Sequence, residues 1–133
     1  MYIQTIYLDQ VWEIRHKVFW PDKPLDFIKM ELDSEGIHLG LFDNTLISVV
    51  SIFKEGKDMQ FRKLGTLNEF QGKGYGTILM NHVLEFAKKE GMNRLWCNAR
   101  IAKKGFYEKL GMRETGQFFT RDEVDFTIME ILF

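Results

Sequence analysis

The stretch Gln71-Gly72-Lys73-Gly74-Tyr75-Gly76 places three alternating glycines directly before a long amphipathic segment, Thr77 to Glu90. A segment with strand character, Met59 to Leu67, precedes it. A strand, a glycine turn and a helix in this order bind phosphate, because the first N–H groups of a helix lack an intrahelical acceptor and carry partial positive charge. Glycine lets the backbone approach an anion with no Cβ in the way. The stretch therefore predicts a phosphorylated ligand held on main-chain amides.

Two common phosphate-binding loops do not fit this stretch. A P-loop needs Gly-x-x-x-x-Gly-Lys-Ser/Thr, whereas Lys73 is followed by Gly74, so the hydroxyl group that binds magnesium is missing. A dinucleotide fingerprint needs Gly-x-Gly-x-x-Gly near the start of a parallel-sheet domain. Here the spacing is Gly-x-Gly-x-Gly and it falls past the middle of the chain. Spacing and position exclude both loops.

The stretch matches a third pattern, Gln/Arg-x-x-Gly-x-Gly/Ala, with Gln71, Gly74 and Gly76 at its fixed positions. A second block, Ala99 to Met112, ends in Phe106-Tyr107-Glu108-Lys109-Leu110-Gly111-Met112. In this order and at this separation the two blocks resemble the GNAT superfamily of acyl-CoA-dependent N-acyltransferases. The resemblance covers roughly the C-terminal half of the chain.

The resemblance implies an α+β fold with about seven mostly antiparallel strands, a central parallel pair that splays apart, and about four flanking helices. Periodicity and turn residues predict a compatible order: a strand, two helices, three strands, a helix, a strand, a helix and two strands. We expect a single domain over residues 1–133, since this length suits one hydrophobic core.

Local signals place several of these elements. Asp9 is the expected cap of a helix that runs to about Val18, and Trp20 to Pro24 breaks the chain. The remaining predicted features are a short helix over Leu25 to Leu32, a turn at Asp43-Asn44, a buried strand over Arg94 to Asn98, a helix over Ala102 to Leu110, and a final hairpin of Arg113 to Phe119 with Val124 to Phe133.

The resemblance also implies acetyl-CoA as the acyl donor, with no metal ion. The pyrophosphate would lie on the glycine turn and the pantetheine arm on main-chain groups at the end of the preceding strand. Arg100 falls where many family members carry an asparagine that contacts this arm. The implied cofactor-binding residues are Leu64, Gly65, Thr66, Leu67, Gln71, Gly72, Lys73, Gly74, Tyr75, Gly76, Thr77 and Arg100.

Tyr107 is the implied catalytic residue, as the proton donor to the leaving thiolate. A phenol with a pKa of about 10 stays protonated at neutral pH and is only slightly weaker as an acid than a thiol of about 8.5. No general base is apparent, because the strand before the glycine turn holds Gln60, Arg62 and Lys63 but no carboxylate. Glu69 follows in the loop, where a solvated acid is the simpler interpretation.

The resemblance assigns the acceptor to the segment from Ile14 to Asp33. Phe19 and Trp20 are candidates to line a pocket there, and Glu31, Asp33 and Glu35 to attract a cationic amine, although a solvated acidic turn is the better explanation of these acids. The predicted function is transfer of an acetyl group to a primary amine of a small molecule or peptide by direct attack in a ternary complex. The alternative is a non-catalytic acyl-CoA-binding or regulatory module on the same fold.

Composition limits the partners. A net charge of −1 gives no general attraction to nucleic acid, and no apolar stretch is long enough to span a membrane. The three histidines show no metal-ligand spacing, and Cys97 is the only cysteine, which favours a core role and a cytoplasmic location. We expect a monomer or homodimer with a small-molecule or peptide amine as its acceptor.

Overall fold

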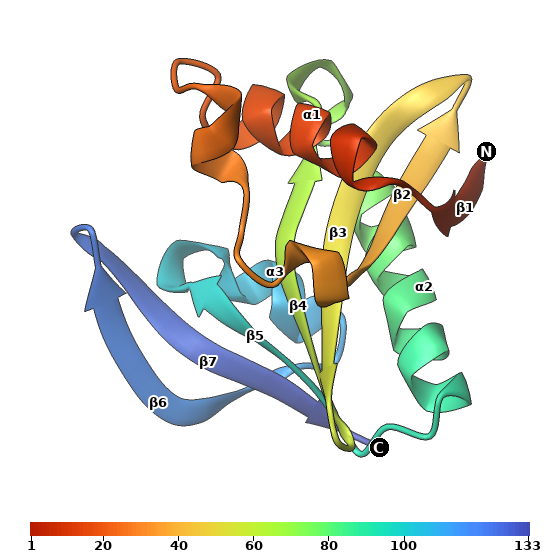
Figure 1. The fold of residues 1–133 in the computed structure, drawn as a ribbon. Helices are drawn as coiled ribbons and strands as arrows, with labels where there is room; N and C mark the ends of the chain where they lie inside the picture. The colour runs from red at the N-terminus through yellow and green to blue at the C-terminus, as the bar shows by residue number, and fades with distance from the viewer. The chain divides into compact units, whose positions relative to one another are not determined.

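The computed structural model describes residues 1–133 and contains seven strands, three α-helices and four short 3₁₀ helices (Figure 1). By its internal contacts the chain divides into two compact units. The first unit comprises Met1–Phe53 and Phe61–His82, and the second comprises Lys54–Gln60 and Val83–Phe133. A single domain over residues 1–133 stays a prediction.

The strands follow the order β1-β2-β3-β4-β5-β7-β6 in one mixed sheet. Strands β4 and β5 pair in parallel, with Met59 opposite Leu95, whereas β1–β2, β2–β3, β5–β7 and β6–β7 are antiparallel. This confirms the predicted fold class. The bounds of the strands are β1 Tyr2–Thr5, β2 Ile37–Asp43, β3 Thr45–Glu55, β4 Asp58–Thr66, β5 Arg94–Arg100, β6 Arg113–Arg121 and β7 Val124–Leu132.

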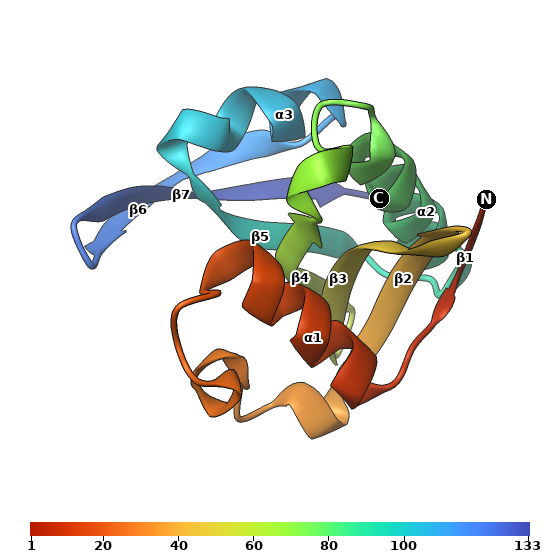
Figure 2. The ribbon, with the colours of Figure 1, turned by 90° about the horizontal axis from the view of Figure 1, so that it is seen from above.

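In the first unit, helix α1 (Leu8–Phe19) packs its apolar side on the sheet. Val11 and Ile14, together with Val18, follow the helical spacing that places residues on one face. They join Ile6 and Val49 in a buried cluster. The first half of helix α2 (Tyr75–Lys89) covers the opposite face of β2 and β3 (Figure 2).

In the second unit, β5, β7 and β6 form the sheet, and helix α3 (Lys104–Lys109) lies over it (Figure 2). The 3₁₀ helix η4 (Ile101–Lys103) joins β5 to α3. Gly91 ends the α2 segment with φ 70°, and the Met92 N–H returns to the Ala87 carbonyl at 3.1 Å. A left-handed glycine of this kind is a common end of an α-helix.

Two expectations for the N-terminal region were wrong. Residues Leu25 to Leu32 form no α-helix but the 3₁₀ helix η1 (Leu25–Ile28), followed by η2 (Asp33–Glu35). The Asp33 carboxylate, which distant Arg15 holds in place, accepts the Met30 N–H at 2.9 Å, so this N–H makes no helical bond. The helix α1 begins one residue before Asp9, and the Tyr7 N–H donates to the Gln10 side chain at 2.9 Å.

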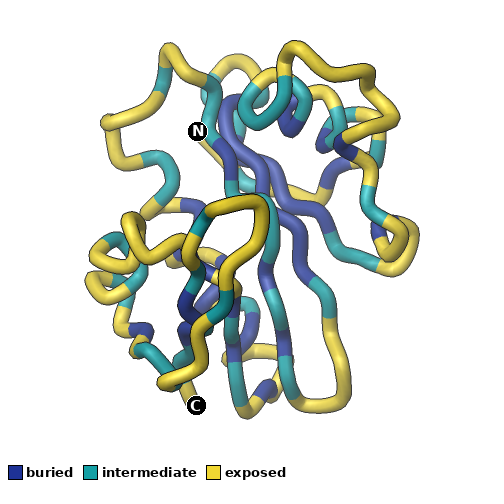
Figure 3. Tube along the Cα trace, turned by 90° about the vertical axis from the view of Figure 1, so that its left-hand side faces the viewer, coloured by how far each residue is buried: buried dark blue, intermediate teal, exposed yellow.

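Buried residues gather in the strands, while the turns are exposed (Figure 3). Residues 47–52 of β3 are all buried, as in a central strand that is covered on both faces. The buried positions of α2 are Leu79, Met80, Val83, Leu84 and Ala87, and Phe86 is partly buried. None of the helices has the length and apolar character that crossing a membrane requires.

Candidate functional site

The glycine turn leads directly into α2 in the first unit. Helix α2 begins at Tyr75, and its first backbone hydrogen bond joins the Ile78 N–H to the Gly74 carbonyl at 3.1 Å. The N–H groups of Tyr75, Gly76 and Thr77 therefore precede the first intrahelical bond, at the end of the helix where the dipole is positive. These are donors that suit an anion.

Gly72 and Gly74 leave the space beside this helix end open. Both have left-handed backbones, with φ of 76° and 87°, and a Cβ built on either one would meet no atom within 4 Å. The left-handed geometry favours glycine for conformational reasons, and the open space leaves room for a ligand to approach the main chain. The turn from Gln71 to Gly74 is exposed. These observations fit a pyrophosphate in a main-chain cradle.

The side chains of the motif fix the turn from both sides. Gln71 donates through Nε2 to the Thr66 carbonyl at 2.9 Å and to Asn68 Oδ1 at 3.1 Å, so it ties the turn to the end of β4. Tyr75 donates its hydroxyl to Asp43 Oδ2 at 3.0 Å, which anchors the start of α2 to the β2–β3 hairpin. The hydrogen bond to Asp43 raises the pKa of Tyr75 above its ordinary value. Both side chains position the amides.

Lys73 contributes positive charge to the turn. Its Nζ lies 5.8 Å from the centroid of the Phe70 ring, which in turn contacts the Tyr75 ring edge to face at 6.1 Å. Lys103 and Lys104 are further basic residues within the second block, Ala99 to Met112. In the second unit Lys104 is paired with Glu114 at 2.9 Å, and that hydrogen bond raises its pKa. Lys104 thus already has a carboxylate partner.

The end of β4 supplies only part of the main-chain groups expected there. The Leu67 N–H donates to the Ile47 carbonyl at 2.9 Å, and the Leu67 carbonyl accepts the Phe70 N–H. The Ser48 hydroxyl donates to the Gly65 carbonyl at 3.0 Å and lies 2.9 Å from Thr66 Oγ1. Both polar groups of Leu67 are therefore used by the fold itself.

Tyr107 lies in α3 of the second unit, half-buried beside the Phe106 ring at a centroid distance of 5.1 Å. Burial, followed by the proximity of Cys97, raises the pKa of Tyr107 far above its ordinary value, and nearby Arg100 opposes this shift. Burial also raises the pKa of Cys97 to about 12. The phenol is therefore fully protonated at neutral pH, and the Cys97 thiol is an inert core residue, as its position in an apolar strand predicts.

The acidic residues proposed for the acceptor divide into two kinds. Glu31 and Glu35 are exposed, whereas Asp33 is 3% exposed and lies against Arg15, which is 1% exposed. Arg15 holds both carboxylate oxygens, at 2.8 and 3.0 Å. Asp33 therefore does not face an acceptor amine: it is a structural anion with its own buried partner.

A buried polar network surrounds this pair. Trp12 Nε1 donates to Asp33 Oδ2 at 2.9 Å, and Arg15 donates to Ser51 Oγ at 2.7 Å. His38 lies between Ser51 Oγ at 2.7 Å and the Asp33 carbonyl at 2.8 Å. Because a carbonyl only accepts, His38 carries a hydrogen on Nε2. Burial alone raises the pKa of Asp33, but hydrogen bonds from Arg15, the Met30 N–H and Trp12 outweigh burial and lower the pKa.

Sequence reasoning missed this network. Arg15 is separated from Asp33 by 18 residues and from Ser51 by 36, so no local pattern connects them. The only available signal was the position of Arg15 within the apolar side of α1, next to Ile14. An arginine at such a position is buried only when it has a partner.

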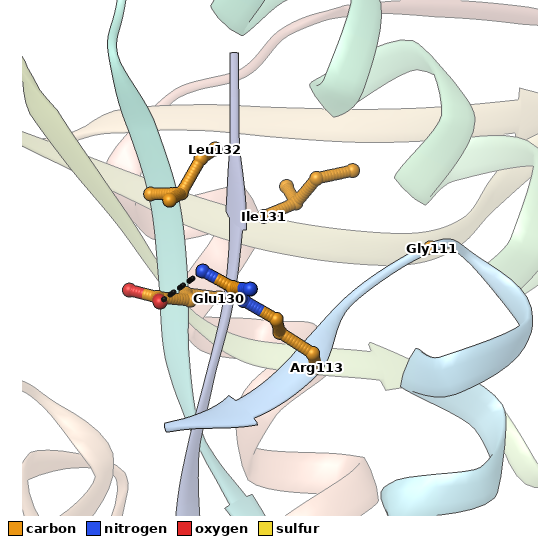
Figure 4. Close-up of a pocket in the computed structure, with 5 residues that line it drawn as sticks. All are labelled: Gly111, Arg113, Glu130, Ile131 and Leu132. Atoms are coloured by element: carbon orange, nitrogen blue, oxygen red, sulfur yellow. Dashed lines mark ion pairs between the residues drawn. The ribbon is translucent and has the colours of Figure 1, made fainter.

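The second unit has a surface hollow of about 260 Å³ lined by Gly111, Arg113, Glu130, Ile131 and Leu132 (Figure 4). Glu130 is bound by Arg94 Nε at 2.6 Å and lies 3.5 Å from Arg113. An anion there would compete with a carboxylate that the two arginines already hold. The hollow contains none of the site residues predicted from the sequence.

Comparisons with known proteins show the family and the fold of the chain. A model of the Acetyltransferase (GNAT) family matches residues 5–112. N-acetyltransferase YitI of Bacillus subtilis (strain 168), itself described as uncharacterised, is 34% identical over 127 residues, which cover 88% of this chain and 85% of YitI.

Two solved structures share the fold. One is a crystal structure assigned as an N-acetyltransferase from Lactobacillus plantarum, with a TM-score of 0.85 and 19% identity over 99% of both chains. The other is a GNAT family acetyltransferase from Elizabethkingia anophelis with acetyl-CoA bound, with a TM-score of 0.76 and 15% identity over 99% of this chain and 97% of that one. The chain therefore belongs to the acetyltransferase (GNAT) family, and it is an acyl-CoA-dependent N-acetyltransferase.

Proposed function

We propose that this chain transfers an acetyl group from acetyl-CoA to a primary amine of a small molecule or peptide, by direct attack of the amine in a ternary complex. The observation that carries the proposal is the array of main-chain donors at the start of α2, beside the open space at Gly72 and Gly74. Bound acetyl-CoA supplies a thioester carbonyl that an amine can attack.

The turn would hold the pyrophosphate. The N–H groups of Tyr75, Gly76 and Thr77 would donate to it, and the helix dipole would add to their attraction for an anion. Lys73 adds a positive charge on an exposed part of the turn. Gln71 and Tyr75 keep the amides in place through their bonds to Thr66 and Asp43.

Tyr107 would donate a hydrogen bond to the sulfur as the C–S bond breaks and would then supply the proton. Its raised pKa keeps the hydroxyl protonated, which this role requires. The same raised pKa makes full proton transfer less favourable than it would be from an ordinary phenol, so hydrogen-bond stabilisation of the thiolate is the larger part of the role.

The strand β4 offers no carboxylate to deprotonate the amine. Asp58, at its start, lies 3.6 Å from Arg94 Nη1, within an ion pair in the second unit. Glu69 is an exposed loop acid. We therefore propose that the amine arrives neutral or loses its proton to water, so the reaction should become faster as pH rises toward the pKa of the acceptor amine.

Tyr107→Phe tests the catalytic role. The phenylalanine keeps the packing against Phe106 and removes only the hydroxyl, so acetyl-CoA affinity should stay unchanged while kcat falls by roughly a hundredfold or more. Thiol release measures kcat, and calorimetry measures the affinity. An equal kcat in the variant would contradict the assignment.

The alternative is a non-catalytic acyl-CoA-binding or regulatory module. It is distinguished by a thiol-release assay with acetyl-CoA against a panel of amines, amino acids and peptides. Binding of acetyl-CoA without thiol release from any acceptor would favour the module. If acetyl-CoA does not raise the melting temperature at all, the proposed site at the turn is wrong. A cytoplasmic location and a monomeric or homodimeric state stay predictions from the sequence.

A further inference from the structure

The end of β4 is joined to the glycine turn by a series of side-chain hydrogen bonds. Gln71, in the turn, donates through Nε2 to the Thr66 carbonyl at 2.9 Å. The Thr66 hydroxyl oxygen lies 2.9 Å from the Ser48 hydroxyl oxygen, and Ser48 donates to the Gly65 carbonyl at 3.0 Å. These four residues form one hydrogen-bond chain, Gln71–Thr66–Ser48–Gly65, which connects the turn to β3 and β4.

The direction of the bonds at Ser48 follows from the hydrogens that each group carries. A carbonyl oxygen only accepts, so the Ser48 hydroxyl gives its one hydrogen to Gly65. Ser48 then accepts from Thr66, whose hydroxyl supplies the other hydrogen. Ser48 is fully buried, so water cannot take the place of its hydroxyl group. Removal of this hydroxyl would therefore leave two polar groups of β4 without the partner that they have now.

The segment that Ser48 holds follows an irregular point of β4. Lys63 has a φ of 56°, in the left-handed region that is unfavourable for a residue other than glycine. The other residues of this kind, Asn44, Asp122 and Glu123, lie between paired strands, whereas Lys63 lies inside a strand. Two residues further on, Gly65 has no side chain to restrict its backbone. The position of this segment therefore depends on contacts with its neighbours.

The end of α1 packs on the same segment. A Cβ built on Gly65 would approach the Phe19 ring to 3.0 Å and the Val18 side chain to 3.3 Å. The Lys63 Nζ lies 4.6 Å from the centroid of the Trp20 ring and 5.5 Å from that of the Phe19 ring. Apolar contacts are non-directional, so they do not fix how the peptide groups of this segment are oriented. Hydrogen bonds have a preferred geometry and do fix it.

We propose that Ser48 and Thr66 are positioning residues for acetyl-CoA, because they hold the end of β4 in place relative to the glycine turn before the acyl donor binds. This inference rests on the proposed function, in which the turn binds the pyrophosphate and residues 64–67 bind the pantetheine arm. Both hydroxyls act through the backbone of β4. With this segment already ordered, binding of the arm costs less conformational entropy.

The test compares the affinity for acetyl-CoA with that for adenosine 3′-phosphate 5′-diphosphate, a fragment that has the diphosphate but lacks the pantetheine arm. Calorimetry measures both affinities. The unaltered protein should bind acetyl-CoA more tightly than the fragment, because only acetyl-CoA reaches residues 64–67. Ser48→Ala should weaken acetyl-CoA binding by about three- to tenfold, the range expected for a neutral hydrogen bond. The affinity for the fragment should stay unchanged.

Ser51→Ala is the matched control. Ser51 lies in the same strand, is also fully buried, and its hydroxyl lies 2.7 Å from Arg15 Nη2 and 2.7 Å from His38 Nδ1. Both substitutions remove a buried hydroxyl with two hydrogen bonds, so both should lower the melting temperature. Only Ser48→Ala should change the ratio of the two affinities, and only Ser48→Ala should raise KM for acetyl-CoA while KM for the acceptor stays unchanged.

Thr66→Val removes the other hydroxyl of the hydrogen-bond chain. It keeps the shape of the side chain, the main-chain carbonyl that Gln71 binds, and the bond from Ser48 to Gly65. The position is partly exposed, so this variant provides the same comparison if Ser48→Ala does not fold. Thr66→Val should weaken acetyl-CoA binding by about two- to threefold, again with the affinity for the fragment unchanged.

Three results would overturn this inference and leave the proposed function intact. The first is an unchanged ratio of the two affinities in Ser48→Ala or, if that variant does not fold, in Thr66→Val. The second is an equal change of the ratio in Ser51→Ala. The third is equal affinity of the unaltered protein for acetyl-CoA and the fragment. Failure of the unaltered protein to bind acetyl-CoA would instead overturn the proposed function, and this inference with it.

Discussion

The glycine turn and the Arg15–Asp33 network both lie in the first unit, but their polar groups differ in burial and in hydrogen-bond pairing. In the network a carboxylate, a guanidinium, a hydroxyl and an imidazole bind one another and are buried. At the turn, the N–H groups of Tyr75, Gly76 and Thr77 precede the first intrahelical bond, and an added Cβ at Gly72 or Gly74 would meet open space. Paired buried groups hold a fold together, whereas donors left unpaired near water are ready for a ligand. The difference separates structural polar residues from binding ones.

Breaking the network should give the largest change in stability. Asp33→Ala leaves the Arg15 guanidinium buried without its partner, which should lower the free energy of unfolding by about 3–5 kcal/mol. Urea denaturation measures the change. Asp26→Ala is the matched control, because Asp26 is 88% exposed in its pair with Lys29 and should change stability little. Equal losses of unfolding free energy in the two variants would mean that the buried pair stabilises the fold no more than the exposed pair does.

Filling the turn should affect binding more than folding. Gly74→Ala adds strain at a left-handed residue and places a methyl group in the space proposed for the pyrophosphate, so we expect about tenfold weaker binding of acetyl-CoA. Gly56→Ala is the control, because Gly56 also has a left-handed φ, of 61°, and nothing within 4 Å of an added Cβ. Both variants should lose about 1–2 kcal/mol of stability. Calorimetry that shows equal affinity in both would contradict the assigned site.

Lowering the pH should reduce the stability that the network contributes, gradually and by less than the substitutions above. Because hydrogen bonds lower the pKa of Asp33 in the folded chain, its contribution to stability is fully present above the unfolded value of about 3.9 and is lost as pH falls through the folded value. The melting temperature of the unaltered protein should therefore decrease as the pH is lowered below about 4. The melting temperature of the Asp33→Asn variant should decrease less over the same range. The main-chain donors of the turn have no such titration. A parallel decline in Asp33→Asn would assign the effect to other carboxylates.

The sequence predicted the turn and its helix well, because that structure is local. Gly74 and Gly76 occupy fixed spacings, and the apolar positions from Leu79 to Ala87 repeat with the helical period. The short helix over Leu25 to Leu32 was predicted wrongly, because the path of that segment depends on a bond from Met30 to the Asp33 side chain. The position of the Asp33 side chain depends in turn on Arg15, 18 residues away in the chain, so no local pattern in the sequence reveals it.

The sequence by itself determined the family, the order of the strands along the chain, and the glycine turn that precedes α2, since each depends on residues that are neighbours in the chain. Only the tertiary structure showed that Asp33 is a buried partner of Arg15 and that Lys63 lies on Trp20 and Phe19. These contacts join residues that are far apart in the chain. Burial and pairing, which decide whether a charge supports the fold or meets a ligand, exist only once the chain has folded.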